Sequence, residues 1–217
     1  VTDLSYSISS ATWSSFIPGQ FYTGDEVTGN IRIWNGPSTV PLEILNIYSA
    51  GVSSMVDLKR NCLLIGFVDG MVGVYDVENR KFIFQNISGH CGPIFDLKFH
   101  PTNPEVLITS GREGAVCTWN TSTMKQIDRI TSFDSNDHFN SMDVSPGGGM
   151  IACGFVDGLI AFFSLQTKLK IFEFQICKQP LISLNFSLFE PELIITSSLH
   201  GFCSILNVQT YSLPLSS

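Results

Sequence analysis

Four acidic side chains placed shortly before glycines are the first candidates for chemistry in this sequence. They are Asp25, Asp69, Glu113 and Asp157. Two carboxylates can share acid–base work or a metal ion when they lie close together. However, Asp-Gly is a common tight-turn dipeptide, and turns of separate sheets lie more than about 10 Å apart. We therefore interpret all four as structural turn residues.

Other reactive residue types also lack a catalytic arrangement. The four histidines, which include His90 and His200, do not have a metal-binding spacing. The glycine-rich stretch 145–150 has no lysine of the P-loop type, and no G-x-S-x-G motif is present. The six cysteines form no C-x-x-C pair, which disfavours zinc. The sequence predicts no catalytic residue, no cofactor and no metal.

Composition excludes further classes. A net charge of −7 with only 12 lysines and arginines argues against nucleic-acid binding. No run of 18 apolar residues is present, so membrane insertion is not expected. The first residues lack a signal-peptide pattern, and scattered cysteines are typical of a reducing compartment, so we expect a cytoplasmic protein.

A repeat organises the chain. Five times a glycine is followed by four strand-forming residues and then a large apolar residue. The glycines are Gly29, Gly70, Gly114, Gly158 and Gly201, and the large residues are Trp34, Tyr75, Trp119, Phe163 and Leu206. Successive glycines are 41 to 44 residues apart, a period that indicates stacked supersecondary units.

Each unit contains four short runs rich in β-branched and aromatic residues. In the third unit the predicted strands are 92–100, 105–111, 115–120 and 125–130, from the innermost to the outermost. A single four-stranded sheet cannot bury both faces, whereas stacked sheets bury them against one another. The sequence therefore predicts an all-β fold.

The segment 88–120 resembles a WD-repeat, with Gly89-His90 at its start and Trp119-Asn120 at its end. In that family a His, a Ser or Thr, an Asp and the Trp form a buried hydrogen-bond network. The resemblance implies that His90, Thr109 and Trp119 belong to such a network, with Glu113 in place of the Asp.

The other units resemble the repeat more loosely. Asp69 and Asp157 match its turn aspartate, but Ile65 and Ala152 stand where the hydroxyl is expected. We therefore expect packing, rather than the network, to hold those units together.

The resemblance implies a WD40-type β-propeller with five four-stranded blades in a single domain, 1–217. The expected blades are about 4–48, 49–90, 91–135, 136–178 and 179–217. The outermost strand of the last blade would fall in 211–217, where Pro214 makes a poor strand. Such propellers usually have seven blades, so we expect part of a larger propeller, seven-bladed or double. Additional blades or self-association would then close the ring, and the alternative is a closed ring of five blades.

The loops between the second and third strands form one edge of the sheets, here called the turn rim. The resemblance implies a non-catalytic scaffold that presents this rim to partner proteins. The candidate contact residues are Asp25, Arg112, Phe139, Val156 and His200. One alternative is a structural subunit of a coat, transport or cytoskeletal assembly. Another is an enzyme with an axial pocket, for which the inner strands offer only Asp96 and Asp143.

Overall fold

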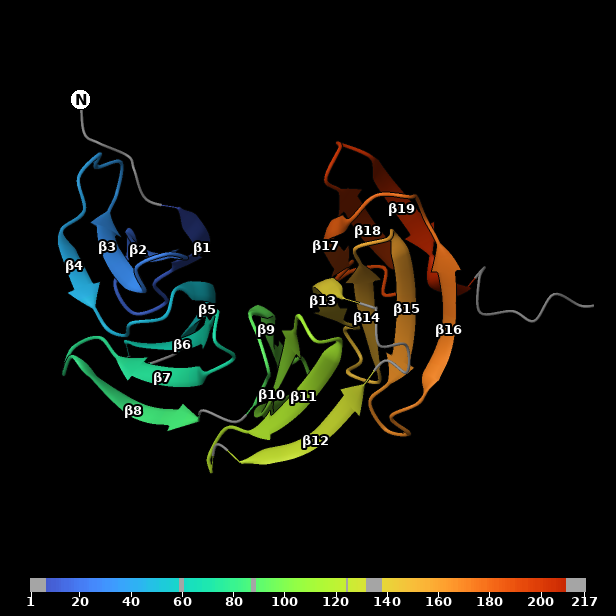
Figure 1. Ribbon diagram of the computed structural model, residues 1–217, viewed down its shortest axis with the longest axis horizontal. Helices are drawn as coiled ribbons and strands as arrows, with labels where there is room; N and C mark the ends of the chain where they lie inside the picture. The colour runs from blue at the N-terminus through green and yellow to red at the C-terminus, as the bar shows by residue number, and fades with distance from the viewer. Residues whose placement is uncertain (1–6, 59–60, 87–88, 124, 132–137, 210–217) are drawn as a thin grey trace, which may run out of the picture. The chain divides into compact units, whose positions relative to one another are not determined.

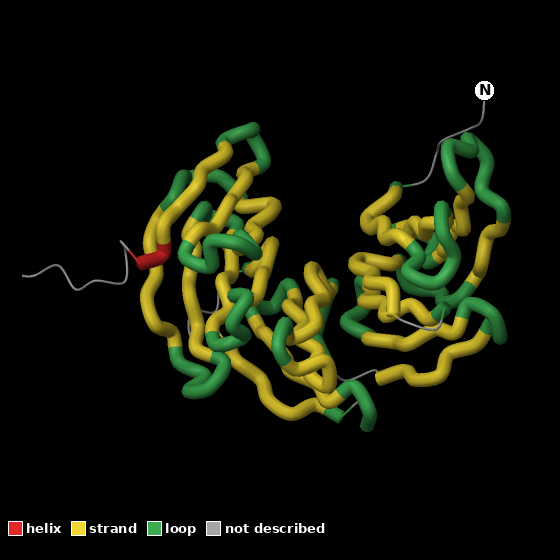
Figure 2. Tube along the Cα trace, turned by 180° about the vertical axis from the view of Figure 1, so that it is seen from behind, coloured by secondary structure: helices red, strands yellow, loops and turns green. Residues whose placement is uncertain are grey.

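The computed structural model describes residues 7–58, 61–86, 89–123, 125–131 and 138–209. In this part of the chain the fold is all-β, with strands joined by short loops (Figures 1 and 2). The strands form four four-stranded sheets and one three-stranded sheet, each of consecutive antiparallel strands. The fourth strand expected at 211–217 lies outside the described residues.

We name the sheets A to E in chain order. Sheet A contains β1 (Ile8–Trp13), β2 (Gln20–Asp25), β3 (Asn30–Asn35) and β4 (Glu43–Asn46). Sheet B contains β5 (Val52–Leu58), β6 (Cys62–Phe67), β7 (Val72–Asp76) and β8 (Lys81–Asn86). Sheet C contains β9 (Ile94–His100), β10 (Asn103–Gly111), β11 (Ala115–Asn120) and β12 (Gln126–Thr131). Sheet D contains β13 (Phe139–Val144), β14 (Met150–Phe155), β15 (Leu159–Ser164) and β16 (Lys170–Gln175). Sheet E contains β17 (Leu181–Phe186), β18 (Leu193–Ser198) and β19 (Cys203–Asn207).

The chain forms two compact units, residues 1–97 and 98–217, and the division falls inside β9. In the first unit, sheets A and B bury a shared core that includes Tyr22, Ile31, Val52 and Phe67. The expected single domain and its blade limits stay predictions.

In the second unit sheet D is covered on both faces. One core joins it to β10–β12 through residues such as Ile108 and Phe139. Another core joins it to sheet E through Phe162 and Leu184. The middle strands β14 and β15 are therefore buried along nearly their whole length, whereas β16 alternates between exposed and half-buried side chains.

The repeat seen in the sequence corresponds to one repeated turn between the second and third strands. All five turn glycines have a positive φ, between 69° at Gly29 and 87° at Gly70. In sheets B to E the glycine N–H donates to the carbonyl three residues earlier, as from Gly158 to Phe155 at 3.2 Å. In sheet A the bond runs four residues back, from Gly29 to Asp25 at 3.2 Å. The turn of sheet A is thus one residue longer.

Candidate functional site

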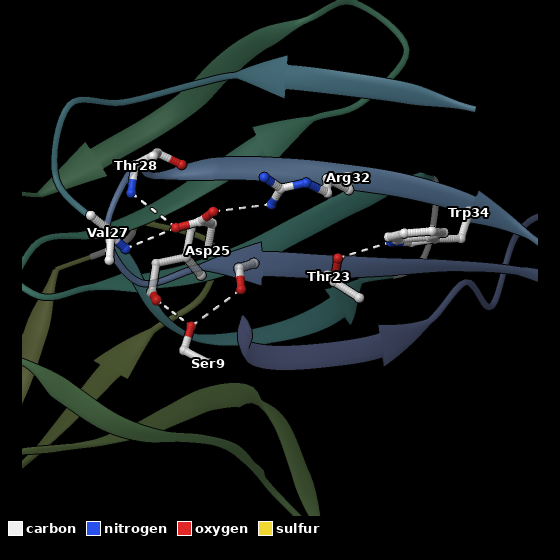
Figure 3. A network of polar contacts seen from close by, with 9 residues as sticks. Ser9, Thr23, Asp25, Val27, Thr28, Arg32 and Trp34 are labelled. Atoms are coloured by element: carbon white, nitrogen blue, oxygen red, sulfur yellow. Dashed lines mark hydrogen bonds and ion pairs between the residues drawn. The ribbon is translucent and has the colours of Figure 1, made fainter. Parts of the chain in front are cut away.

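The longer turn of sheet A is built around a buried carboxylate (Figure 3). Asp25 accepts hydrogen bonds from the amides of Val27 and Thr28, at 2.9 and 3.0 Å. Its other oxygen forms an ion pair with Arg32 across the hairpin at 3.2 Å, and both side chains are almost fully buried. Burial acts to raise the pKa of Asp25, but the hydrogen bonds from Thr28, Val27 and Arg32 outweigh it and hold this pKa below its ordinary value. The carboxylate is therefore a charged structural element of the turn.

A tryptophan–threonine hydrogen bond occurs in two sheets with the same geometry. The Trp119 indole donates to the Thr109 hydroxyl at 2.9 Å in sheet C, and Trp34 donates to Thr23 at 2.9 Å in sheet A. Both threonines lie on the second strand, two residues beyond the residue that pairs with the tryptophan. Sequence reasoning missed Thr23. Thr109 lies five residues before its turn glycine, whereas the extra residue in the turn of sheet A places Thr23 six residues before Gly29.

The strand register corrects one position in sheet D. Ile151 pairs with Phe163, so the residue equivalent to Thr109 is Cys153 and not Ala152. In sheet B the equivalent residue is Ile65, as expected from the sequence. Cys153 is fully buried and lies in the core shared with Phe139 and Phe163.

The sequence GFVDG occurs twice, at 66–70 and 154–158, and both copies form the same turn. Asp69 accepts a hydrogen bond from the amide of Met71 at 3.0 Å, and Asp157 accepts one from Leu159 at 3.0 Å. Such bonds to the amide two residues on are Asx-type turn contacts. Asp69 also hydrogen-bonds Tyr48, which raises the pKa of the tyrosine, and burial adds to this effect. Both carboxylates thus have structural partners within their own unit.

The four residues expected to form the network of sheet C belong to different units. His90 is buried in the first unit, while Thr109, Glu113 and Trp119 belong to the second. Glu113 forms an ion pair with Arg129 at 3.1 Å. The full network stays a prediction, and the Trp119–Thr109 bond is the part that lies within one unit.

The turn rim differs from the expected contact set at two residues. Asp25 is 0% exposed and Phe139 is 1% exposed, so neither side chain offers a contact surface. This corrects the expectation for both, because Asp25 is enclosed by its turn and Phe139 lies in the core between β10 and sheet D. The other three candidates, Arg112, Val156 and His200, are exposed.

The tips of the rim turns are fixed by backbone hydrogen bonds. The Val156 amide donates to the His138 carbonyl at 3.2 Å, and the Leu199 amide donates to the Pro180 carbonyl at 3.0 Å. His138 in turn donates its Nδ1 proton to the Arg112 carbonyl at 2.9 Å. The side chains of Val156 and Leu199 are 38% and 58% exposed. A backbone held in this way presents its apolar side chains in a defined place.

The opposite edge carries exposed apolar residues that sequence reasoning did not select. Leu188 and Phe189, in the loop between β17 and β18, are 81% and 95% exposed. Their signal in the sequence is a pair of large apolar residues in a loop bounded by Ser187 and Pro191.

The inner-strand aspartates do not add a catalytic arrangement. Asp143 forms an ion pair with Lys98 at 3.5 Å and accepts the amide of Phe186 at 2.7 Å, which links β9, β13 and β17. Asp96 accepts the amide of Leu97 at 3.1 Å. Within the described residues no three His, Cys, Asp or Glu side chains are grouped so that they could hold a metal ion. The described part of the chain also contains no helix long and apolar enough to cross a membrane.

Residues 81–120 match the WD domain, G-beta repeat. The chain is similar to the WD repeat-containing protein 91 homolog of Dictyostelium discoideum, at 26% identity over 174 residues, which cover 78% of this chain and 22% of that protein. It is similar to WD repeat-containing protein VIP3 of Arabidopsis thaliana, at 30% identity over 206 residues, 88% of this chain and 63% of that protein. Human nucleoporin Nup43 is 29% identical over 101 residues, 44% of this chain and 27% of that protein.

The chain spans less than two thirds of the length of each of these relatives. The chain thus contains a WD40 repeat and is similar to WD repeat-containing proteins at low identity. Its repeated four-stranded antiparallel sheets are consistent with a WD40 β-propeller.

Proposed function

We propose that this protein is a non-catalytic scaffold that presents its turn rim to partner proteins. The observation that supports this most directly is the combination of fixed backbone and exposed apolar side chains at Val156 and Leu199. Exposed apolar residues among charged ones, such as Arg112, are typical of protein contact sites. Loops held by a rigid scaffold are also where binding residues concentrate.

A comparison of two surfaces of sheets D and E tests the proposal. The rim variant Val156→Asp/Leu199→Asp places charges at the fixed turn tips, and Leu188→Asp/Phe189→Asp places the same charges on the opposite edge. Each protein is immobilised, and the proteins that it retains from a cell lysate are quantified by mass spectrometry. We expect the rim variant to lose proteins that the wild type and the opposite-edge variant retain. Equal retention by the rim variant and the wild type would refute the rim as the contact surface.

A structural subunit of a larger assembly is the second candidate. The nucleoporin similarity favours it, because the name of that relative describes a component of an assembly. In this case the retained proteins should remain together in fixed ratios on a sizing column. We further propose, from Pro18–Asn35 and the order of the repeats, a finer resemblance to WD repeat-containing protein 17.

We also propose that the protein functions in the cytoplasm and does not bind nucleic acid. The buried positions of Cys117 and Cys153 support a reducing compartment, because these thiols serve as small apolar core residues. The net charge of −7 disfavours contact with a phosphate backbone.

A further inference from the structure

One position of the repeat has a different environment in the first sheet. The residue six places after each turn glycine ends the third strand of its sheet. In sheets B to E its side chain caps the turn that follows, because it accepts the backbone amide two or three residues on. These capping residues are Asp76, Asn120, Ser164 and Asn207. Such contacts are the usual role of Asn, Asp and Ser at turns.

Asn35 occupies this position in sheet A, where neither capping bond is formed. The residue two places on is Pro37, which has no N–H, and the amide of Ser38 donates to the backbone carbonyl of Asn35 at 3.4 Å. The Asn35 side chain is exposed. It is followed by Gly36, and this is the only asparagine–glycine pair in the 217-residue sequence.

An exposed asparagine followed by glycine can convert without an enzyme. The Gly36 amide nitrogen attacks Cγ of Asn35, and the C–N bond of the carboxamide breaks to release ammonia, which takes up the amide proton. One water molecule then opens the resulting imide at either carbonyl and leaves aspartate or isoaspartate. No electron is transferred in either step. Glycine favours the attack because it has no side chain to hinder close approach of its backbone.

The fold holds the attacking nitrogen in a hydrogen bond. The Gly36 N–H donates to the Gly19 carbonyl at 2.7 Å. Gly19 lies in the loop between β1 and β2, and in this loop Ser14 Oγ accepts two backbone amides, at 3.0 and 3.2 Å. The nitrogen can reach Cγ of Asn35 only after it leaves the Gly19 carbonyl. The reaction therefore requires that the contact between these two loops open.

We propose that Asn35 is a modification site, at which the side-chain amide converts to aspartate or isoaspartate when the Gly36–Gly19 hydrogen bond opens. The product adds one negative charge to a chain whose net charge is −7. Isoaspartate also lengthens the main chain by one methylene group directly after β3, which displaces the Gly36 amide from the Gly19 carbonyl. The conversion is thus a consequence of opening and hinders closure. It is independent of the turn rim and of the proposed function.

Peptide mass spectrometry follows the conversion at each asparagine separately. The 217-residue chain is kept at mildly alkaline pH, either folded or unfolded in guanidinium chloride, and is then digested with trypsin, which releases residues 33–59. Electron-transfer fragmentation distinguishes aspartate from isoaspartate. Asn120 and Asn207 are internal references, because β-branched residues follow them at the same position of the repeat.

We expect Asn35 to convert at least about 10-fold faster than Asn120 and Asn207 in the unfolded chain, because only Asn35 precedes a glycine. In the folded chain Asn35 should convert at least about 10-fold more slowly than in the unfolded chain, because the loops must first open.

Two serine variants test the role of the loop contact. Ser14→Ala removes the acceptor that orders the Gly19 loop, so it should raise the folded-state rate about 2- to 10-fold. Ser187→Ala is the matched control, because it removes a hydroxyl that accepts the Glu190 amide at 3.1 Å in sheet E, and the Asn35 rate should not change. Circular dichroism verifies folding. If Ser14→Ala does not fold, guanidinium chloride below the unfolding transition replaces it and should raise the rate in the wild type.

Three results would each overturn the proposal. The first is an unfolded chain in which Asn35 converts no faster than Asn120. The second is an equal rate in the folded and unfolded chains. The third is a folded-state rate that neither Ser14→Ala nor dilute guanidinium chloride raises above that of Ser187→Ala.

Discussion

Removal of the Asp25 carboxylate should destabilise the first unit far more than an ordinary surface ion pair would. Asp25→Ala removes the carboxylate that pairs with Arg32, whose side chain is 6% exposed. It also removes the acceptor of the Val27 and Thr28 amides. Loss of one partner of a buried ion pair costs about 3–5 kcal/mol, because the other charge stays in a poorly solvated place.

The second unit contains a matched control. Glu113 and Arg129 form an ion pair at 3.1 Å, but their side chains are 19% and 33% exposed. Solvent screens such a pair, so Glu113→Ala should lower the free energy of unfolding by about 0–1 kcal/mol. Both substitutions remove an acid that forms an ion pair with an arginine. They differ in the burial of the pair and in the two amide hydrogen bonds that Asp25 accepts.

Hydrogen exchange followed by mass spectrometry measures the two units separately. Peptides from β2 and β3 report on the first unit, and peptides from β14 and β15 serve as an internal reference. We expect Asp25→Ala to reduce protection in β2 and β3 and to leave the reference peptides unchanged. The double variant Asp25→Ala/Arg32→Leu should recover much of the loss, because it removes the buried charge. If Asp25→Ala lowers the free energy of unfolding no more than Glu113→Ala does, burial does not determine how much the Asp25–Arg32 pair stabilises the protein, and the reasoning is wrong.

Three further predictions concern pH, the indole bond and the turn glycines. The pKa of Asp25 is lowered in the folded state. The Asp25 carboxylate therefore contributes fully to the free energy of unfolding at neutral pH, and this contribution is lost as the pH falls through the folded-state pKa. In chemical denaturation, the stability advantage of the wild type over Asp25→Asn should shrink between pH 7 and about pH 3. Thr109→Val should cost about 1–3 kcal/mol in thermal unfolding, because the buried Trp119 indole loses its acceptor; an unchanged midpoint would contradict this. Gly201→Ala, at φ +82°, should lower the free energy of unfolding by about 1–2 kcal/mol, because alanine is strained at a positive φ. Gly158→Ala, at φ +86°, should cost at least about 1 kcal/mol more, because its Cβ would also clash with backbone atoms. Equal losses in chemical denaturation would contradict this prediction.

The strand order within each sheet could be predicted from the sequence, because the turn glycines recur with fixed strand-forming neighbours. The third unit illustrates this: the predicted strands 105–111 and 115–120 correspond to β10 and β11, joined by the turn at Gly114. A positive φ at the same place in each unit is a local requirement that glycine meets without steric cost. Such local rules remain visible in a single sequence.

The equivalence of positions between sheets was harder to predict, because one inserted residue changes the count. Counting back from Gly29 places Gly24 where Thr109 stands in sheet C, although Thr23 is the residue that accepts the Trp34 bond. The structure resolves this through the longer turn, in which the hydrogen bond reaches back to Asp25. Hydrogen-bond register, rather than distance along the chain, defines which residues are equivalent.

Burial of the candidate contact residues could not be predicted from their local sequence. The segment DEVTG at 25–29 has the composition of a solvated loop, yet Asp25 is fully buried. Its burial depends on Arg32 across the hairpin, which a loop composition does not reveal. Phe139 is a second example, because it begins a strand near the rim and yet its side chain packs in the core.

The turn glycines separate what the local sequence fixes from what neighbouring sheets fix. Gly158 and Gly201 have nearly the same φ, but a Cβ at Gly158 would overlap the carbonyl oxygen of Cys177. Cys177 lies in the segment that leads from β16 into sheet E. Among the described residues nothing lies within 4 Å of a Cβ at Gly201. The turn therefore forms from its own residues, whereas its environment depends on the sheet that follows.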